Sequence, residues 1–353
     1  MDYDLIADLE LSITETAFER LEAETSSDFT RVTTTISLVG PGQHENVAGR
    51  GEDVTYDADE HDRLAETGLP ELAGEYTVDS FSDCLDDLDL FPSGVPSTDA
   101  FRHYRRWALE SAALDLACRQ AETDLANVVG RRPTPLRFVA STRLGDPPTI
   151  DRVRALRDRV PGIELKLDPT PAWDADLIDA LVALDAVRVL DLKGHYEGTD
   201  VDVPADPELY ANLIEAFPDA VVEDPALTPE TRPLFDEPAV RERVAWDAPI
   251  HGVSDLEALP WEPGWLNIKP SRFGSLESLF EALAWCRDRN VKLYGGGQFE
   301  LGVGRGQLQL LAGLYYPDGP NDVAPGDYNE PDLPANLPSS PLELPAERSG
   351  FRW

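Results

Sequence analysis

The sequence predicts an α/β fold, a (β/α)7β TIM-like barrel with an N-terminal α+β capping domain. The first observation is a series of seven apolar segments, which begin at residues 136, 163, 187, 220, 243, 265 and 292. Successive segments start 22 to 33 residues apart, which is room for one strand, one helix and two loops. Buried strands that alternate with helices indicate a parallel sheet, and seven such units indicate a closed barrel.

The second observation is that five of these apolar segments end in a charged residue. The segments IELKLD, VRVLDLKG, AVVEDP, RVAWDAP and WLNIKP carry Lys166, Asp191, Glu223, Asp247 and Lys269 near their ends. Because the active site of a barrel lies at the C-terminal ends of its strands, we expect these five side chains to meet on one rim.

The capping domain is expected at residues 1–128, where strand patterns precede helical ones. The β-branched segment 31–39 predicts a strand, residues 46–54 its hairpin partner, and residues 59–67 a short helix. The acidic segment 80–94 is expected to be irregular. Apolar residues at three- and four-residue spacings predict a helix over residues 98–121, with Ser97 or Thr98 as N-cap.

The barrel is expected at residues 129–326. Helices between its strands are predicted at residues 150–159, 174–184, 207–217, 231–241 and 275–289. The stretch from Asn321 is rich in proline and acid, which is typical of a non-repetitive wrap, and we expect the tail 327–353 to pack back on the capping domain.

The composition excludes several classes of function. The 353 residues include 67 acidic and 30 basic ones, for a formal net charge of −37, whereas nucleic acids and anionic membranes require a cationic surface. The acids are spread along the whole chain, which is typical of adaptation to high salt in a halophile. The three cysteines lie far apart without a CxxC pair, and the acidic N-terminus does not resemble a signal peptide. We therefore expect a cytoplasmic protein without disulfides or membrane spans.

The lysines are concentrated on the expected rim. The chain has only four, Lys166, Lys193, Lys269 and Lys292, against 26 arginines. Lys166 and Lys269 lie inside apolar segments, where an amine is costly unless it is paired or functional. Carboxylates from three neighbouring strands suit Mg²⁺, with Mn²⁺ as a second candidate, and a lysine beside such an ion can act as a base. The alternative is a structural ion pair.

These residues, in this order, resemble the enolase superfamily and within it the muconate-lactonising subgroup, which includes muconate cycloisomerase and o-succinylbenzoate synthase. Lys166 matches the second, catalytic lysine of the family's Lys-x-Lys motif, and Lys269 in NIKPSRFGSL matches the lysine of the sixth strand. The resemblance assigns three metal ligands, Asp191, Glu223 and Asp247. It implies Mg²⁺-dependent abstraction of the α-proton of a carboxylate substrate through a stabilised enolate.

The resemblance extends over nearly the whole chain. Glu300 in GGGQFELGVGRG takes the acidic position of the seventh-strand segment, while residues 49–54 and 110–121 resemble the capping-domain hairpin and the helix that leads into the barrel. The reactions implied are cycloisomerisation, dehydration as in o-succinylbenzoate synthesis, and racemisation or epimerisation. The partner expected is a small-molecule carboxylate, with homo-oligomerisation implied by the resemblance alone.

Two positions depart from the family pattern. Glu164 replaces the first lysine of Lys-x-Lys, and Lys193 replaces the asparagine of the family's Asp-x-Asn. We interpret this exchange as an ion pair between Glu164 and Lys193. The alternative is that Lys193 weakens the metal site and leaves a metal-binding protein without catalysis.

Other candidates remain. His195, His251, Arg143 and Arg272 follow strand ends, and the two arginines could hold a substrate carboxylate or form surface salt bridges. GVGRG does not have the spacing of a dinucleotide fingerprint. A Schiff-base lyase that uses Lys166 or Lys269 without a metal is the enzymatic alternative.

Overall fold

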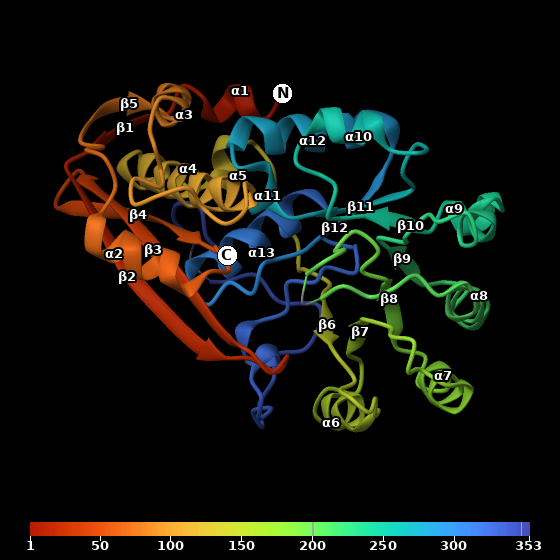
Figure 1. Cartoon of the computed structure of the whole chain (residues 1–353). Coiled ribbons are helices and arrows are strands. Elements are labelled where there is room, and N and C mark those ends of the chain that lie inside the picture. The colour runs from red at the N-terminus through yellow and green to blue at the C-terminus, as the bar shows by residue number, and fades with distance from the viewer. Residues whose placement is uncertain (200, 347) are drawn as a thin grey trace.

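The computed structural model describes residues 1–199, 201–346 and 348–353, in which an α+β capping domain lies beside a curved parallel sheet (Figure 1). The strands of the capping domain are β1 (Glu10–Ile13), β2 (Glu15–Glu24), β3 (Thr30–Pro41), β4 (Asn46–Asp53) and β5 (Gly74–Thr77), and its helices are α1 (Tyr3–Ile6), α2 (Ala58–Thr67), α3 (Val78–Asp86), α4 (Ala100–Gln120) and α5 (Leu125–Val128). Strands β2, β3 and β4 form an antiparallel sheet, and β1 pairs with β5. The four elements expected at residues 31–39, 46–54, 59–67 and 98–121 are thereby confirmed.

Helix α4 lies directly on β4, and two glycines of that strand permit the close approach. A Cβ at Gly51 would lie 1.9 Å from the Ala108 carbonyl oxygen, and a Cβ at Gly49 would lie 2.2 Å from the Ala112 carbonyl oxygen. Only glycine fits at such contacts. The helix begins after Asp99, one or two residues later than the expected N-cap, and no side chain caps its first turn.

Helix α3 includes residues 80–86 of the segment expected to be irregular, so the prediction was wrong there, whereas residues 87–94 contain no helix or strand, as expected. The helix begins with a capping box in which Ser80 N–H donates to Thr77 Oγ1, while Thr77 N–H donates to Ser80 Oγ. Phe81 and Leu85, four residues apart, are both buried. The many aspartates hid this helix, because their charges lie on its exposed face.

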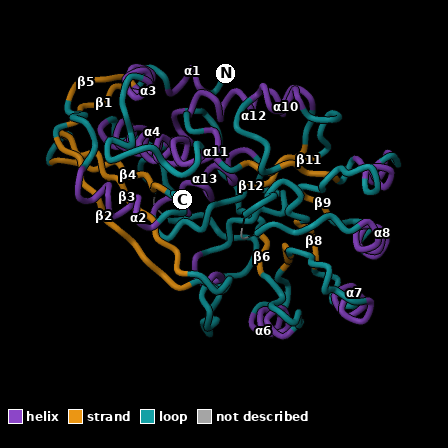
Figure 2. The backbone as a smooth tube through the Cα atoms, in the orientation of Figure 1, coloured by secondary structure: helices purple, strands orange, loops and turns teal. Residues whose placement is uncertain are grey.

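The parallel sheet contains the seven strands expected from the sequence. They are β6 (Val139–Thr142), β7 (Glu164–Leu167), β8 (Val187–Asp191), β9 (Val221–Glu223), β10 (Val244–Trp246), β11 (Trp265–Ile268) and β12 (Lys292–Gly295). Each strand pairs with the next along the chain. The helices of this part are α6 (Asp151–Arg159), α7 (Ala175–Val182), α8 (Pro207–Ala216), α9 (Pro238–Arg241), α10 (Val253–Ala258), α11 (Pro270–Phe273), α12 (Leu276–Arg289) and α13 (Val303–Tyr315), with 3-10 turns η1 (Arg232–Phe235) and η2 (Gly326–Asn329). Helices α6, α7 and α8 lie outside the strands (Figure 2).

Residues 321–322 close the sheet into a barrel. Asn321 forms a parallel bridge with Phe138 beside β6, and Asp322 forms one with Gly296 beside β12. The Asn321 side chain adds a further contact, because the Gly295 N–H donates to its Oδ1 at 2.6 Å. This short segment therefore occupies the eighth strand position, which the proline- and acid-rich pattern from Asn321 did not predict.

Two helices of the structure differ from those predicted from the sequence. The helix expected at residues 231–241 is divided into η1 and α9, and Pro238 begins the second piece because proline cannot continue a hydrogen-bonded turn. Helix α13 was not predicted, since Gly302, Gly304 and Gly306 give its first turn the appearance of a loop.

The tail contacts both parts of the molecule. Gly350 forms a bridge with Asp124 of the capping domain, and Leu342 forms one with Leu136 before β6. The described residues include no helix with the length and apolar character needed to cross a membrane. All three cysteines are free thiols.

Candidate active site

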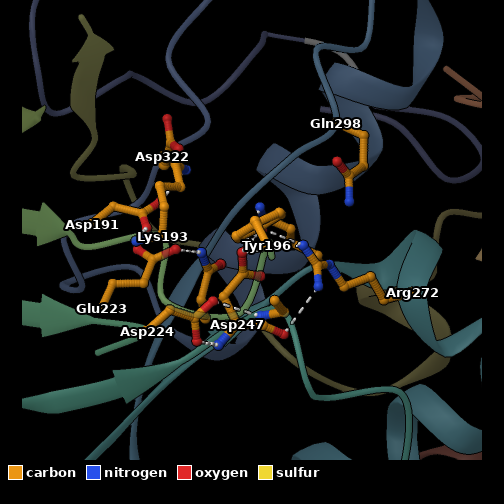
Figure 3. Close-up of polar contacts among 12 residues, drawn as sticks. Asp191, Lys193, Tyr196, Glu223, Asp224, Asp247, Arg272, Gln298 and Asp322 are labelled. Carbon is orange, nitrogen blue, oxygen red and sulfur yellow. Dashed lines mark hydrogen bonds and ion pairs between the residues drawn. The ribbon is translucent and has the colours of Figure 1, made fainter. Parts of the chain in front are cut away.

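The five charged residues predicted on one rim do lie together at the C-terminal ends of their strands. Asp191 and Glu223 are the last residues of β8 and β9 and stand opposite each other in the sheet, while Asp247 and Lys269 directly follow β10 and β11. Lys166 is the third residue of β7. The three carboxylates are fully buried, and the two lysines are 2% and 7% exposed. Figure 3 shows Asp191, Glu223 and Asp247 reaching toward one another from three strands.

An apolar layer lies beneath these charges. Val189, Val221, Ala245 and Tyr294 form a separate buried cluster inside the barrel. The first three come two residues before Asp191, Glu223 and Asp247, and Tyr294 comes two residues before Gly296. Positions two apart on a strand share a face, so the alternation that buries these side chains also directs the charged ones into the barrel mouth.

Lys166 connects two of the carboxylates. Its Nζ lies 2.7 Å from Glu223 Oε2 and 3.2 Å from Asp191 Oδ2, with Asp322 Oδ2 at 3.5 Å. Burial alone would lower the pKa of Lys166, but the charges of Glu223 and Asp191 raise it well above the usual lysine value. The ammonium form is therefore stabilised by this arrangement.

Glu223 is held by two neutral donors as well. The Tyr294 hydroxyl donates to Oε2 at 2.6 Å, and the Asn267 side-chain amide donates to Oε1 at 3.0 Å. Burial, together with repulsion from Asp191, raises the pKa of Glu223 to about 8. Negative charge is thus crowded at this point of the rim.

Asp247 is bound on the other side of the cluster. Lys269 Nζ lies 2.8 Å from Asp247 Oδ2, and Arg272 Nη2 lies 3.2 Å from the same oxygen. Tyr196, in the loop after β8, donates to that oxygen at 3.2 Å and accepts from Arg272. The other oxygen, Asp247 Oδ1, is buried and has no hydrogen-bond partner among the described residues.

Asp224 positions Asp247 through the backbone. Its carboxylate accepts the N–H groups of Asp247 and Ala248, both at 2.8 Å. Burial and the charge of Asp247 raise the pKa of Asp224 to about 7. Asp224 therefore fixes where the chain turns after β10.

The donor set suits a hard divalent cation. Within the described residues, no three His, Cys, Asp or Glu side chains are arranged to hold a metal ion, because lysine ammonium groups lie between the carboxylates. The oxygens are nevertheless the ligands that Mg²⁺ prefers, and one of them is unpaired. The carboxyl groups of this cluster (Asp168, Asp191, Glu223, Asp224, Asp247 and Asp322) outnumber the cations that contact them (Arg143, Lys166, Lys193, Lys269 and Arg272). A divalent cation would offset this surplus of acidic groups.

The expected ion pair between Glu164 and Lys193 does not form. Glu164 is the first residue of β7, at the opposite end from the rim, and its carboxylate binds Arg137 and Arg188. Lys193 lies beyond the C-terminal end of β8, with its Nζ 2.5 Å from Asp191 Oδ2 and 3.7 Å from Asp168 Oδ2. The prediction was wrong because each residue has a nearer partner of opposite charge.

The remaining candidates occupy more peripheral places. Glu300 accepts the Gln298 N–H at 2.7 Å and lies 3.7 Å from Arg305, not among the rim carboxylates. The His195 ring lies 5.5 Å from Trp246, and the His251 ring lies 5.8 Å from that of His103. Figure 3 shows Gln298 well apart from Asp191 and Glu223.

Sequence reasoning did not single out five residues that contact the cluster: Tyr196, Asp224, Asn267, Tyr294 and Asp322. Two of them could have been found. Asn267 lies two residues before Lys269, and Tyr294 two residues before Gly296, so strand alternation places both on the inner face. Asp322 follows no strand pattern in the sequence.

Comparisons with known proteins agree with this architecture. The family models for the N-terminal and C-terminal domains of "Domain of unknown function (DUF8230)" match residues 4–128 and 132–330. An o-succinylbenzoate synthase from Bacillus subtilis (strain 168) is 26% identical over 277 residues, which are 71% of this chain and 70% of that protein.

Solved structures show the same fold. A member of the enolase superfamily from Listeria innocua Clip11262 superposes with a TM-score of 0.64 at 17% identity, over 90% of this chain and 86% of that one. A dipeptide epimerase from Methylococcus capsulatus, complexed with Mg ion, gives a TM-score of 0.61 at 17% identity, over 93% and 89% of the two chains. The fold is therefore that of the enolase superfamily, a barrel with an α+β cap.

Proposed function

The chain belongs to the DUF8230 family, whose description names no activity, and we propose that it is an enzyme that removes the α-proton of a carboxylate substrate with the help of a divalent cation. The observation that carries the proposal is the pair of buried lysines, Lys166 and Lys269, which approach three convergent carboxylates from β7 and from the end of β11. Buried lysines in contact with buried carboxylates at a barrel mouth are typical of acid–base chemistry.

Asp191, Glu223 and Asp247 are the residues that would hold the cation, with Mg²⁺ as the first candidate and Mn²⁺ as the second. When bound, such a cation would neutralise these carboxylates, which removes the charges that raise the lysine pKa values, and would stabilise negative charge on the substrate carboxylate. The similarity to an o-succinylbenzoate synthase and to a dipeptide epimerase complexed with Mg ion supports this assignment.

The lysines carry the proton. The C–H bond next to the substrate carboxylate breaks, its electron pair stays on the substrate as an enolate, and the proton passes to the Nζ of whichever lysine, Lys166 or Lys269, is then a neutral amine. The other lysine, on the far side of the carboxylates, can return a proton or balance charge. If a proton returns to the opposite face of the enolate, the result is racemisation or epimerisation. If the enolate instead loses a neighbouring hydroxyl group as water, the result is dehydration, and if a group within the substrate attacks or leaves, the result is cycloisomerisation.

The neighbouring residues orient these groups. Tyr294 and Asn267 fix Glu223, Asp224 fixes the backbone of Asp247, and Arg272 with Tyr196 fixes its carboxylate. A network in which each carboxylate has fixed donors restricts the ligand geometry, which favours rapid proton transfer.

Solvent deuterium exchange tests the proposal. Acyl-amino acids, dipeptides and succinyl-substituted acids are incubated with the protein in D2O, with Mg²⁺ or with a chelator. We expect Mg²⁺-dependent deuterium uptake at an α-carbon, lost in Lys166→Ala and Lys269→Ala but retained in Lys292→Ala, whose lysine is exposed at the start of β12. Uptake that persists with the chelator would contradict the role of the metal, and uptake that persists in both site variants would contradict the role of the lysines.

A further inference from the structure

Lys193 is the cation most closely bound to a rim carboxylate. Its Nζ lies 2.5 Å from Asp191 Oδ2, and its backbone N–H donates to Asp191 Oδ1 at 3.2 Å. The backbone of Lys193 has φ +53°, a conformation that non-glycine residues seldom adopt. One residue thus occupies both oxygens of a proposed metal ligand.

A second carboxylate lies within reach of the same ammonium group. Asp168, directly after β7, has its Oδ2 3.7 Å from Lys193 Nζ and 3.4 Å from Arg143 Nε. Asp168 and Lys193 both line a cavity of about 520 Å³, which gives the lysine side chain space to turn away from the rim. Lys166 has a comparable second partner, because Asp322 lies 3.5 Å from its Nζ.

We propose that Lys193 competes with the divalent cation for Asp191, and that Asp168 receives the Lys193 ammonium group when the cation binds. The inference rests on the proposed function, since it requires Asp191 to be a metal ligand. It adds a role for Lys193 and Asp168, which are positioning residues here: they set the affinity of the metal site and do not touch the reacting atoms.

The argument is electrostatic. A Mg²⁺ ligand oxygen lies about 2.0–2.1 Å from the ion, so an ammonium group hydrogen-bonded to the same oxygen would lie only about 4 Å from a divalent charge of the same sign and is repelled by it. Withdrawal to a place without a counter-ion would leave a poorly solvated charge, because the Lys193 side chain is only 14% exposed. Asp168 avoids that cost, because its Oδ2 lies 3.7 Å from the Lys193 Nζ, only about one ångström farther than the Asp191 Oδ2 at 2.5 Å.

The test is the affinity for Mn²⁺, measured by electron paramagnetic resonance and titration calorimetry in concentrated KCl, which suppresses weak binding to the acidic surface. Lys193→Asn removes the charge and keeps a residue that tolerates positive φ. We expect it to bind Mn²⁺ at least about tenfold more tightly than the unchanged protein, because a like charge next to the ion is lost. Glu223→Gln, which removes a proposed ligand, identifies the binding that belongs to this site.

Lys292→Asn is the matched control. It removes the same charge from an exposed position at the amino end of β12 and should leave the Mn²⁺ affinity within about twofold, as expected for a screened, distant charge. Tightening in Lys292→Asn equal to that in Lys193→Asn would overturn the inference, because net charge alone would explain both.

Asp168→Asn tests the second half of the proposal with Lys193 in place. Without the alternative partner, Lys193 should remain on Asp191, and Mn²⁺ should bind several-fold more weakly. In the double variant Lys193→Asn, Asp168→Asn, this loss should disappear. Equal Mn²⁺ affinity in the unchanged protein, Lys193→Asn and Asp168→Asn would overturn the inference alone, whereas no binding sensitive to Glu223→Gln in any variant would overturn the proposed function together with it.

Discussion

The hydroxyl of Tyr294 donates a 2.6 Å hydrogen bond to Glu223, although the two residues lie on β12 and β9, three strands apart. Both side chains are fully buried. The bond crosses the inside of the barrel and connects its apolar layer with the charged rim. Glu223 therefore depends on a residue outside the three-carboxylate pattern.

At about pH 9, above the Glu223 pKa of about 8, Tyr294→Phe should lower the free energy of unfolding by about 1.5–3 kcal/mol, because it removes a hydrogen bond to a buried charged group. The measurement is equilibrium urea denaturation in chelator. Tyr315→Phe is the control, since the Tyr315 hydroxyl also donates to a carboxylate, that of the partly exposed Asp2. An equal loss in both variants would contradict a special role for the Tyr294–Glu223 bond.

The sequence was sufficient to predict the barrel because its strands are short apolar segments at regular intervals. Burial on both faces of a parallel strand leaves this pattern in the residues themselves. The eighth strand position left no such pattern, since residues 321–322 join the barrel through two isolated bridges and the Asn321 side chain. Tertiary contacts, not local propensity, place that segment.

The positions of the rim residues could be predicted for the same reason. A charged residue at the C-terminal end of an apolar barrel strand lies at the mouth of the barrel. The partners of these residues could not be predicted. The ion pair between Glu164 and Lys193 was predicted from the alternation of side chains along their strands. The two residues lie at opposite ends of those strands, and Arg137 and Arg188 lie nearer to Glu164. Ion pairs between strands depend on register, which the sequence does not state.

Salt should stabilise this protein more than it stabilises a protein whose net charge is close to zero. The formal net charge of −37 produces repulsion throughout the folded chain. Raising KCl from about 0.1 M to about 1 M shortens the screening length from about 10 Å to about 3 Å, so the urea midpoint should increase. An unchanged midpoint over that range would contradict the assignment of the acidic surface to salt adaptation.

The tail residue Phe351 should be essential for stability. Its ring is fully buried and packs edge-on against Trp107 of α4, while its N–H donates to the buried Asp115 at 2.8 Å. Phe351→Ala should cost about 3–5 kcal/mol of unfolding free energy, as do other large buried aromatics. Leu5→Ala, at a position 51% exposed, is the control. A cost no greater than that of the control would show that the tail does not hold the capping domain.

His61 connects β3 with the loop after β4. The ring is fully buried, with Nδ1 2.9 Å from the Thr34 hydroxyl and Nε2 2.8 Å from the Thr55 carbonyl oxygen. A neutral imidazole satisfies both contacts when Nε2 carries the hydrogen and Nδ1 accepts from Thr34. Burial lowers the pKa of His61 from 6.5, despite the nearby charge of Asp53.

The protein should therefore lose stability when the pH falls below 6.5. In that range the unfolded chain binds a proton at His61 and the folded protein does not, so the free energy of unfolding falls by up to about 1.4 kcal/mol per pH unit. Above pH 6.5 this contribution is fully present. Comparing urea denaturation at pH 7.5 and pH 5.5, we expect His61→Gln to show a smaller loss than the unchanged protein, because glutamine is neutral at both values. His44 is exposed, so His44→Gln should lose as much stability between the two pH values as the unchanged protein. If His61→Gln also lost as much stability as the unchanged protein, His61 would be protonated in the folded state.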